Sequence, residues 1–327
     1  MIINWAPLIE LVDAHESFVL TSHTRADCDA VGSELGMAGV LEALGKRVRI
    51  INADAPPPHI AFLDPAGKVE VLGHGATAAD AHAADVHLVL DTSAWGQLGE
   101  MADVIRASPA RKAVIDHHVS GDDLGAVVLK DTTAEATGRL VIEAAEALGV
   151  ALTKPIADPL FCAIAPDTGW FRFPSVTEKT FAALAKLVAA GAEPSAAFNT
   201  LYEQNTAARV RLHGRVMERM ATTHGGRVAY SAARESDFAE TGALVSDTED
   251  VVNRLLSVAG VEVAALLVWM DAQRTKVSLR SRGDFDVREV AEEFGGGGHT
   301  KAAGVRVPGT VDDAQRMILE ALGRRLV

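Results

Sequence analysis

The chain has 327 residues, of which 48% are hydrophobic and 23% are charged, a composition typical of globular proteins and a length that favours two domains over one. Its 31 basic and 44 acidic residues give a net charge of −13, and only 5% of the residues are aromatic. Proteins that bind long nucleic acid usually have a broad basic surface or a series of stacking rings, so this class is disfavoured and a phosphorylated substrate would be small.

Nothing in the sequence indicates a membrane-bound or exported protein. No apolar run approaches the roughly 20 residues needed to span a bilayer, and the N-terminal residues lack the basic start and cleavage site of a signal peptide. The two cysteines, Cys28 and Cys162, cannot form a disulfide framework. We therefore expect a cytoplasmic protein with no membrane partner.

The first half of the chain alternates short apolar strands with helices. The predicted strands are 18–22, 48–52, 86–90 and 113–115, and the predicted helices are 29–44, 134–148, 155–165 and 177–190. This alternation predicts a parallel sheet with helices on both faces. In such a sheet the ligand site lies at the carboxyl ends of the strands.

The pattern changes after residue 190, where a Gly and a Pro interrupt it. One long helical segment is predicted over about 195–222. Strands are then predicted at 227–232, 261–270, 276–280 and 302–307, and helices at 247–258, 286–294 and 311–323. The fold class is therefore α/β: an N-terminal catalytic domain over 1–190, a helical linker over 191–224, and a smaller C-terminal α/β domain over 225–327.

Carboxylates and imidazoles follow the predicted strands of the first half. The candidates are His23, Asp27, Asp29, Asp91, Asp116, His117, His118 and Asp167. A single Asp after a strand is most often a turn former or a helix cap, but here four segments meet at one edge of one sheet. Four of these carboxylates repel one another at one place unless they are protonated or neutralised by cations, namely Asp27, Asp29, Asp91 and Asp167.

Two divalent ions would neutralise these four carboxylates. Oxygen-rich ligation with one or two imidazoles favours Mn²⁺, with Mg²⁺, Co²⁺ and Zn²⁺ as alternatives. A two-metal pair suits the displacement of an oxygen at phosphorus, so the sequence predicts a metal-dependent phosphoesterase. His118 is a candidate to contact the phosphate or to protonate the leaving group; the alternative is that it orients His117.

These motifs together resemble the DHH phosphoesterase superfamily. The resemblance is carried by His23-x3-Asp27-x-Asp29, Asp91, the triplet Asp116-His117-His118, and Asp167-Thr168-Gly169. The glycine run 295–298 with His299, preceded by Ser278-Leu279-Arg280-Ser281, resembles the accessory domain called DHHA1. The order of motifs along nearly the whole chain is similar to that of the bacterial nanoRNases, also called oligoribonuclease and pAp phosphatase proteins.

The resemblance implies a ligand assignment. His23 and Asp27 would hold one metal, Asp29, His117 and Asp167 would hold the other, and Asp91 would bridge the two. Asp116 would support the site through a hydrogen bond to His117 or His118, so the catalytic candidates are His118, Asp91 and Asp116. Three residues depart from the family pattern, namely Ala26, Cys28 and Pro166, and none of them removes a proposed ligand.

The second domain is predicted to bind the substrate. Successive glycines are costly in chain entropy and suit close approach of the backbone to a ligand, although a flexible loop is the alternative. Arg280 suits a phosphate because its guanidinium donates two parallel hydrogen bonds. The substrate-binding candidates are Arg280, Ser281, Gly296, Gly297, Gly298 and His299.

The predicted reaction is hydrolysis of short 5′-phosphorylated oligoribonucleotides, such as the dinucleotide pApA, to mononucleotides, with pAp to AMP as a second activity. A linearised cyclic dinucleotide is a further candidate substrate. The expected partners are these small nucleotides and not long duplex nucleic acid, and a homodimer stays open. The alternatives are an inorganic pyrophosphatase, whose second domain would lack the glycine run, and a silent nucleotide sensor, which would lack a ligand.

Overall fold

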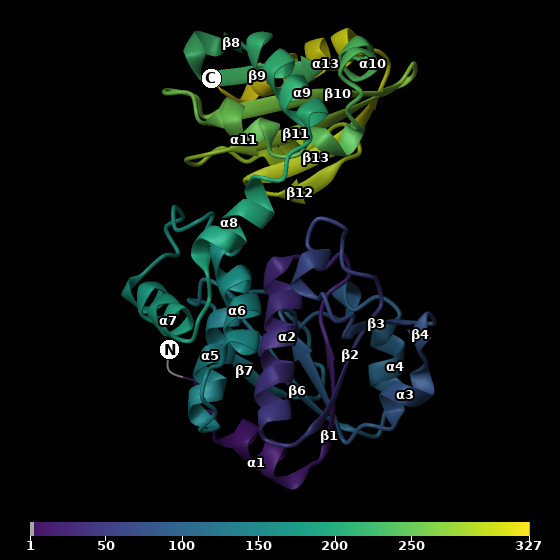
Figure 1. The fold of residues 1–327 in the computed structure, drawn as a ribbon. Helices are drawn as coiled ribbons and strands as arrows, with labels where there is room; N and C mark the ends of the chain where they lie inside the picture. Colours follow the sequence, from purple (N-terminus) through teal and green to yellow (C-terminus); the bar gives the residue numbers. More distant parts are fainter. Residues whose placement is uncertain (1–2, 327) are drawn as a thin grey trace. The chain divides into compact units, whose positions relative to one another are not determined.

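The computed structural model describes residues 3–326 and divides into two compact units, the first ending at Gln204 and the second beginning at Asn205. Figure 1 shows both units as a ribbon. The extreme residues of the predicted domains, 1–2 and 327, lie outside the described residues.

The first unit is built on a seven-stranded sheet in the order β4-β3-β2-β1-β5-β6-β7, with every pair of neighbours parallel. Its strands are β1 (Ser17–Thr21), β2 (Arg47–Asn52), β3 (Val69–Leu72), β4 (Gly75–Ala76), β5 (Val86–Leu90), β6 (Arg111–Asp116) and β7 (Val127–Lys130). The central strands β1 and β5 are buried at every position, as expected of parallel strands that are covered on both faces.

Helices cover both faces of this sheet (Figure 1). They are α1 (Ala6–Ala14), α2 (Cys28–Ala43), α3 (Ala78–His82), α4 (Met101–Ala107), α5 (Thr137–Ala147), α6 (Lys154–Asp167), α7 (Glu178–Ala189) and α8 (Pro194–Tyr202), with short 3₁₀ turns η1 (Ala61–Leu63) and η2 (Trp95–Gln97). Phe18 and Leu20 of β1 pack with α1, α2, α5 and α6 in one core, whereas Val19 packs with α3 and α4 in another. Alternate residues of one strand therefore serve two cores.

The close packing of α2 on α6 positions two acidic side chains, one from each helix. A Cβ on Gly32 would lie 2.4 Å from the carbonyl oxygen of Pro159, so only glycine allows this approach. Asp29 lies in the first turn of α2 and Asp167 is the last residue of α6. The helix pair thereby fixes two carboxylates relative to one another.

The second unit contains a six-stranded mixed sheet in the order β12-β13-β11-β10-β9-β8, in which only β9 and β10 are parallel. Its strands are β8 (Ala221–Thr223), β9 (Val228–Ala233), β10 (Val263–Asp271), β11 (Arg274–Ser281), β12 (Gly297–His299) and β13 (Ala302–Pro308). Its helices are α9 (Ala207–Glu218), α10 (Glu235–Thr241), α11 (Val251–Leu256), α12 (Val287–Glu292) and α13 (Val311–Arg325), with 3₁₀ turns η3 (His224–Gly226) and η4 (Val245–Thr248).

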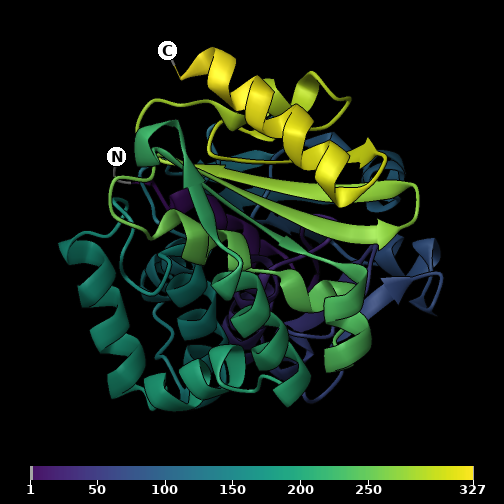
Figure 2. The same ribbon diagram turned by 90° about the horizontal axis from the view of Figure 1, so that it is seen from above.

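This sheet is also covered on both faces. Val263, Ala265 and Leu267 of β10 pack with α12 and α13, whereas the alternate residues Ala264 and Leu266 pack with α9 and α11. Figure 2 shows α13, in yellow, lying along one side of the strands. The predicted α/β fold class, with a parallel-sheet domain and a smaller second α/β domain, is confirmed.

The predicted single helix over 195–222 is wrong. The structure has α8 and α9 in its place, followed by strand β8. The side chain of Thr206 accepts a hydrogen bond from the backbone N–H of Arg209 at 3.1 Å, so it caps a new helix where the prediction continued an old one. Among the helices of residues 3–326, none alone is long and apolar enough to cross a membrane; α7 and α8 have the length and composition only as a pair bent by 103°.

Candidate active site

The first part of the site lies between β1 and α2. Asp27 caps α2, because its Oδ1 accepts hydrogen bonds from the backbone N–H groups of Asp29 at 3.0 Å and Ala30 at 3.1 Å. His23 Nδ1 lies 3.0 Å from the carbonyl oxygen of Thr24, which only accepts, so this nitrogen carries the proton. His23 Nε2 is left to face Asp27 at 4.0 Å and Asp91 at 3.4 Å.

Asp91 occupies the centre of the site. It directly follows β5, is 1% exposed, and has a φ of 59°, a left-handed conformation that costs about 1–2 kcal/mol for a residue other than glycine. Its Oδ2 lies 3.4 Å from His23 Nε2, and its Oδ1 lies 3.4 Å from His117 Nε2. One carboxylate therefore stands between two imidazoles, one on each of its oxygens.

A second group forms around His117. Its Nε2 lies 3.7 Å from Asp29 Oδ2 and 3.8 Å from Asp167 Oδ2. Its Nδ1 donates to the carbonyl oxygen of Ala134 at 3.1 Å, which again leaves Nε2 as the free nitrogen. Three segments that are distant in sequence thus meet at one imidazole.

The donor set fits divalent cations. Ligand atoms of His23, Asp27 and Asp91 lie within 4.8 Å of one another, as do those of Asp29, His117 and Asp167. A third group within the same limit joins Asp91 and His117 to His118. Carboxylate oxygens with one imidazole in each main group are a ligand set typical of Mn²⁺ or Mg²⁺.

The electrostatics of the group indicate the same chemistry. Burial, followed by the charges of Asp91 and Asp167, raises the pKa of Asp29 well above its usual range. Burial and the charge of Asp27 raise the pKa of Asp167 to about 8. Burial opposes the charged form of His23, but hydrogen bonding to Asp91 and Thr24 and the charges of Asp91 and Asp27 together outweigh it and raise the pKa to about 9. The site therefore holds protons that cations would displace.

Asp116 and His118 form a separate hydrogen-bonded pair beside this group. Asp116 Oδ1 accepts from the His118 backbone N–H at 3.0 Å and from its Nδ1 at 2.8 Å. Its Oδ2 accepts from Ser93 Oγ at 2.7 Å and faces Lys130 Nζ at 3.0 Å. Burial alone would raise the pKa of Asp116, but the bonds from His118, Ser93 and Lys130 hold it well below its usual range. The bond to Asp116 raises the pKa of His118 in turn, and within residues 3–326 no hydrogen bond engages His118 Nε2.

The segment that runs from β7 into the first turn of α5 supports the ligands, and this role is not apparent from the sequence. The backbone N–H groups of Thr137 and Gly138 donate to Asp29 at 2.7 and 2.8 Å. Thr137 Oγ1 also donates to Asp91 Oδ1 at 2.9 Å. One threonine therefore holds two proposed ligands, while a Thr near a helix start looks in the sequence like an ordinary cap.

A buried ion network anchors the same segment. Arg139 is 3% exposed and its Nε donates to Glu135 Oε2 at 2.8 Å. The guanidinium also contacts Glu143 and lies 3.4 Å from Asp131 Oδ2. Because a buried arginine must be paired, these contacts fix residues 131–139 firmly beside the site.

The three departures from the family pattern are packing positions. Ala26 and Cys28 are buried in the main core, and burial raises the pKa of the Cys28 thiol, so it stays protonated. Pro166 lies in the last turn of α6, next to Asp167. None of the three occupies a ligand position.

The candidates of the second unit lie at the end of β11 and in or directly before β12. Arg280 pairs with Ala302 across β11 and β13, and its Nη1 donates to the Leu279 carbonyl oxygen at 3.0 Å. Within residues 3–326 no carboxylate forms an ion pair with it; burial lowers its pKa, and the charge of Asp250 offsets part of this effect. A half-buried guanidinium without a carboxylate is suited to bind an anion.

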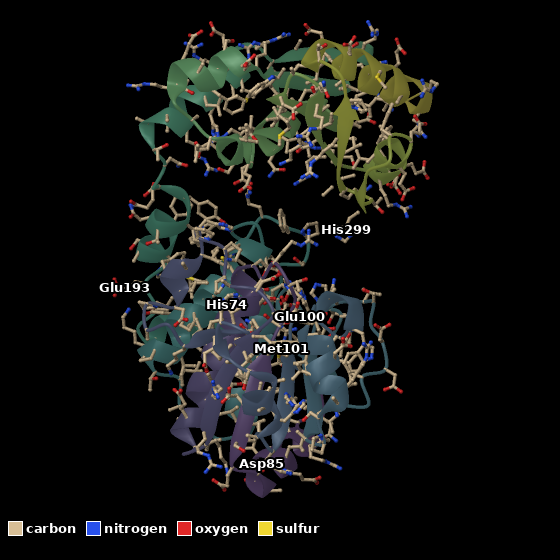
Figure 3. All side chains as sticks on the ribbon, turned by 90° about the vertical axis from the view of Figure 1, so that its right-hand side faces the viewer. His74, Asp85, Glu100, Met101, Glu193 and His299 are labelled. Carbon is tan, nitrogen blue, oxygen red and sulfur yellow. The ribbon has the colours of Figure 1, made fainter. Side chains whose placement is uncertain are left out.

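The glycine run forms an edge strand rather than an irregular loop. Gly297, Gly298 and His299 make up β12 and pair with β13. A Cβ on Gly296 would lie 2.4 Å from the Gly304 carbonyl oxygen, and Gly298 has a φ of 142°, so both positions require glycine. His299, labelled in Figure 3, is exposed at the end of this strand. Ser281 Oγ donates to the Phe285 carbonyl oxygen at 2.7 Å and so fixes the turn after β11.

Comparison with known proteins gives matches over both units. Residues 17–164 match the model of the DHH family N-terminal domain, and residues 225–326 match the DHHA1 domain. A protein of Thermus thermophilus, named bifunctional oligoribonuclease and PAP phosphatase NrnA, is 31% identical over 94% of this chain and 89% of its own length. Its namesake from Bacillus subtilis is 25% identical over 96% of both chains. A crystal structure of an exopolyphosphatase-related protein from Bacteroides fragilis is 26% identical and superposes with a TM-score of 0.89, over 98% of this chain and 96% of that one.

Proposed function

Because the chain belongs to the DHH family and carries a DHHA1 domain, it is a hydrolase of phosphoester bonds, and we propose that it is a metal-dependent enzyme that cleaves short 5′-phosphorylated oligoribonucleotides, such as pApA, to mononucleotides and converts pAp to AMP. The observation that carries the proposal is the Asp91 carboxylate, with one oxygen 3.4 Å from His23 and the other 3.4 Å from His117. A carboxylate between two groups of ligands is suited to bridge two cations.

The proposed metal ligands are those of the two groups around Asp91. His23 and Asp27 would hold one ion, Asp29, His117 and Asp167 would hold the other, and Asp91 would be shared. Two divalent ions bound there, with Mn²⁺ as the first choice and Mg²⁺, Co²⁺ or Zn²⁺ as alternatives, would supply Lewis-acid polarisation of the phosphoryl oxygens. The negative charge of the site supports this assignment, because bound cations would replace the protons that Asp29 and Asp167 otherwise keep.

The residues of the chain have separate tasks in this proposal. Thr137 fixes the carboxylates of Asp29 and Asp91, so the ligands are oriented before substrate arrives. His118 transfers a proton to the leaving oxygen from Nε2, while Asp116 holds its Nδ1. Asp116 in turn is held by Ser93 and Lys130, so it stays ionised throughout.

The second unit is proposed to bind the substrate through Arg280 and β12. Arg280 would donate to a substrate phosphate, because its side chain has no carboxylate partner in the described part of the chain. The backbone of Gly296–Gly298, which carries no side chains, could approach the nucleotide closely, and the exposed His299 would lie against it. Ser281 would support this surface through its bond to Phe285.

The test is chromatographic product analysis after incubation of the purified protein with pApA, pAp and pyrophosphate, each with Mn²⁺ and with a chelator. We expect Mn²⁺-dependent release of AMP from pApA and from pAp. Cleavage of pyrophosphate alone would contradict the nucleotide proposal. Absence of cleavage of all three compounds would favour a different phosphoester or a nucleotide sensor.

A further inference from the structure

A group of aromatic side chains lies in the segment around and after Asp167 and has no part in the proposed catalysis. The chain has 10 Phe, 4 Trp and 2 Tyr, and seven of these lie within residues 161–202. The seven are Phe161, Trp170, Phe171, Phe173, Phe181, Phe198 and Tyr202. Several pack on one another: the ring of Trp170 lies 4.9 Å from that of Phe198 and 5.6 Å from that of Tyr202. Phe173 does not belong to these ring pairs and is 48% exposed.

The backbone that carries Phe173 is strained. Gly169, Trp170 and Phe171 have φ values of 56°, 57° and 66°, so three consecutive residues are left-handed. Two of the three carry large rings, which the left-handed region disfavours. A strained turn of this kind persists only where the surroundings hold it, and it is often found beside functional sites.

Thr168 holds this turn. Its Oγ1 accepts from the Phe171 backbone N–H at 3.1 Å, and its carbonyl oxygen accepts from the N–H groups of Arg172 at 2.9 Å and Phe173 at 3.1 Å. Arg172 Nε donates back to the Gly169 carbonyl oxygen at 2.7 Å. The turn is thus fixed by residues that directly follow the proposed ligand Asp167.

The turn places the ring of Phe173 against Gly169. A Cβ on Gly169 would lie 2.4 Å from Cε1 of Phe173, so the ring occupies space that only glycine leaves open. Gly169 is two residues after Asp167, whose Oδ2 lies 3.8 Å from His117 Nε2. Phe161, by contrast, is only 3% exposed and packs in the core. An exposed ring beside a charged centre suits a ligand that has both a π face and a phosphate.

We propose that Phe173 is the stacking surface for a nucleobase of the nucleotide whose phosphate is held at the site around Asp91. This inference rests on the proposed function and deepens it, because it makes the base itself part of what is recognised. Stacking on a ring tolerates every base, since each base has a π face. Phe173 therefore determines the preference for nucleotides over other phosphoesters, and not the preference for one base over another.

The test compares a nucleotide with a phosphodiester that lacks a base. KM and kcat are measured with Mn²⁺ on pApA and on the matching 5′-phosphorylated abasic dinucleotide, in which hydrogen replaces both bases. Phe173→Leu keeps an apolar side chain on Gly169 and removes the π face. We expect its KM for pApA to rise about 10-fold, equivalent to about 1.4 kcal/mol, and its kinetics on the base-free ester to stay unchanged. Phe173→Trp should bring the KM for pApA back to within about 2-fold of wild type.

The matched control is Phe181→Leu, which removes a ring that is 55% exposed on α7 and does not contact Gly169. Its KM for pApA should equal that of wild type. An equal loss on both substrates in Phe173→Leu, or an unchanged KM for pApA, would overturn the stacking role. A wild-type enzyme that is inactive on pApA would instead overturn the proposed function, so the two failures are distinguishable.

Discussion

The two units hold their candidate functional residues in opposite ways. In the first unit the acidic side chains are fixed by neighbouring groups: Asp29 alone accepts from the backbone of Thr137, from that of Gly138 and from Ser33 Oγ. In the second unit the Arg280 side chain has, among residues 3–326, only the Leu279 carbonyl oxygen as a hydrogen-bond partner, and His299 is exposed. We infer that the proposed catalytic groups are preorganised by the fold, whereas the proposed recognition groups keep their hydrogen-bonding capacity for the ligand.

The largest expected effect comes from Asp91, the centre of the fixed region. Asp91→Ala removes the carboxylate that both groups of ligands share, so Mn²⁺-dependent cleavage of pApA should fall by about 10³-fold or more. Steady-state kinetics and the metal content of the purified variant measure this.

The control for this variant is Asp85→Ala. Asp85 precedes β5, bonds to Ser17 at the amino end of β1, and is labelled in Figure 3 at the end of the first unit away from the carboxyl ends of the strands. Its removal should leave kcat unchanged. Near-normal activity in Asp91→Ala would refute the assignment of the bridging ligand.

A smaller loss of activity is expected when a residue that orients the metal ligands is changed and the ligands themselves are kept. Thr137→Val keeps the shape of the side chain but removes the hydroxyl that donates to Asp91. Either metal affinity or kcat should fall by about 10- to 100-fold, as for other groups that orient metal ligands. Thr133→Val is the matched control, because Thr133 Oγ1 bonds to Asp131 in the same segment and contacts no proposed ligand. Equal effects of the two substitutions would mean that the segment acts only by holding the fold.

The fixed region should also bind metal more tightly as pH rises. The pKa of Asp167 is about 8 and that of His23 is about 9, so below these values each group keeps a proton that the cation must displace. Mn²⁺ affinity should therefore decrease on acidification, by about tenfold per pH unit for each proton displaced. Calorimetry in two buffers of different ionisation enthalpy would measure the protons released, and pH-independent binding without proton release would contradict this electrostatic account.

The smallest of these effects belongs to the second unit. Arg280→Met should raise the KM for pApA about 10-fold and change kcat little, because it removes binding to the phosphate and leaves the chemical step alone. Arg306→Met, on the neighbouring strand β13, is the matched control and should leave KM unchanged. A loss confined to kcat in Arg280→Met would place Arg280 among the fixed catalytic groups and would break the comparison between the units.

The sequence allows the metal-site candidates to be predicted because each follows an apolar strand or ends a helix, and parallel strands bring such positions to one edge. Thr137 could not be found in this way, since its two contacts join residues far apart in the chain. Five short strands are not predicted from the sequence either, because strands of two to four residues at or near a sheet edge are specified by pairing with a neighbour and not by their own pattern; they are β3, β4, β7, β8 and β12. The break between α8 and α9 depends on the helix cap at Thr206. Helix-forming residues on both sides of Thr206 make this cap hard to recognise in the sequence.

The most direct test of the central claim is the anomalous scattering of Mn²⁺ in a crystal of the protein soaked with MnCl₂. We expect two peaks in the first unit, one against His23 and Asp27 and one against Asp29, His117 and Asp167, with Asp91 in contact with both. A single peak that leaves Asp91 without metal, or no peak among these residues, would contradict it.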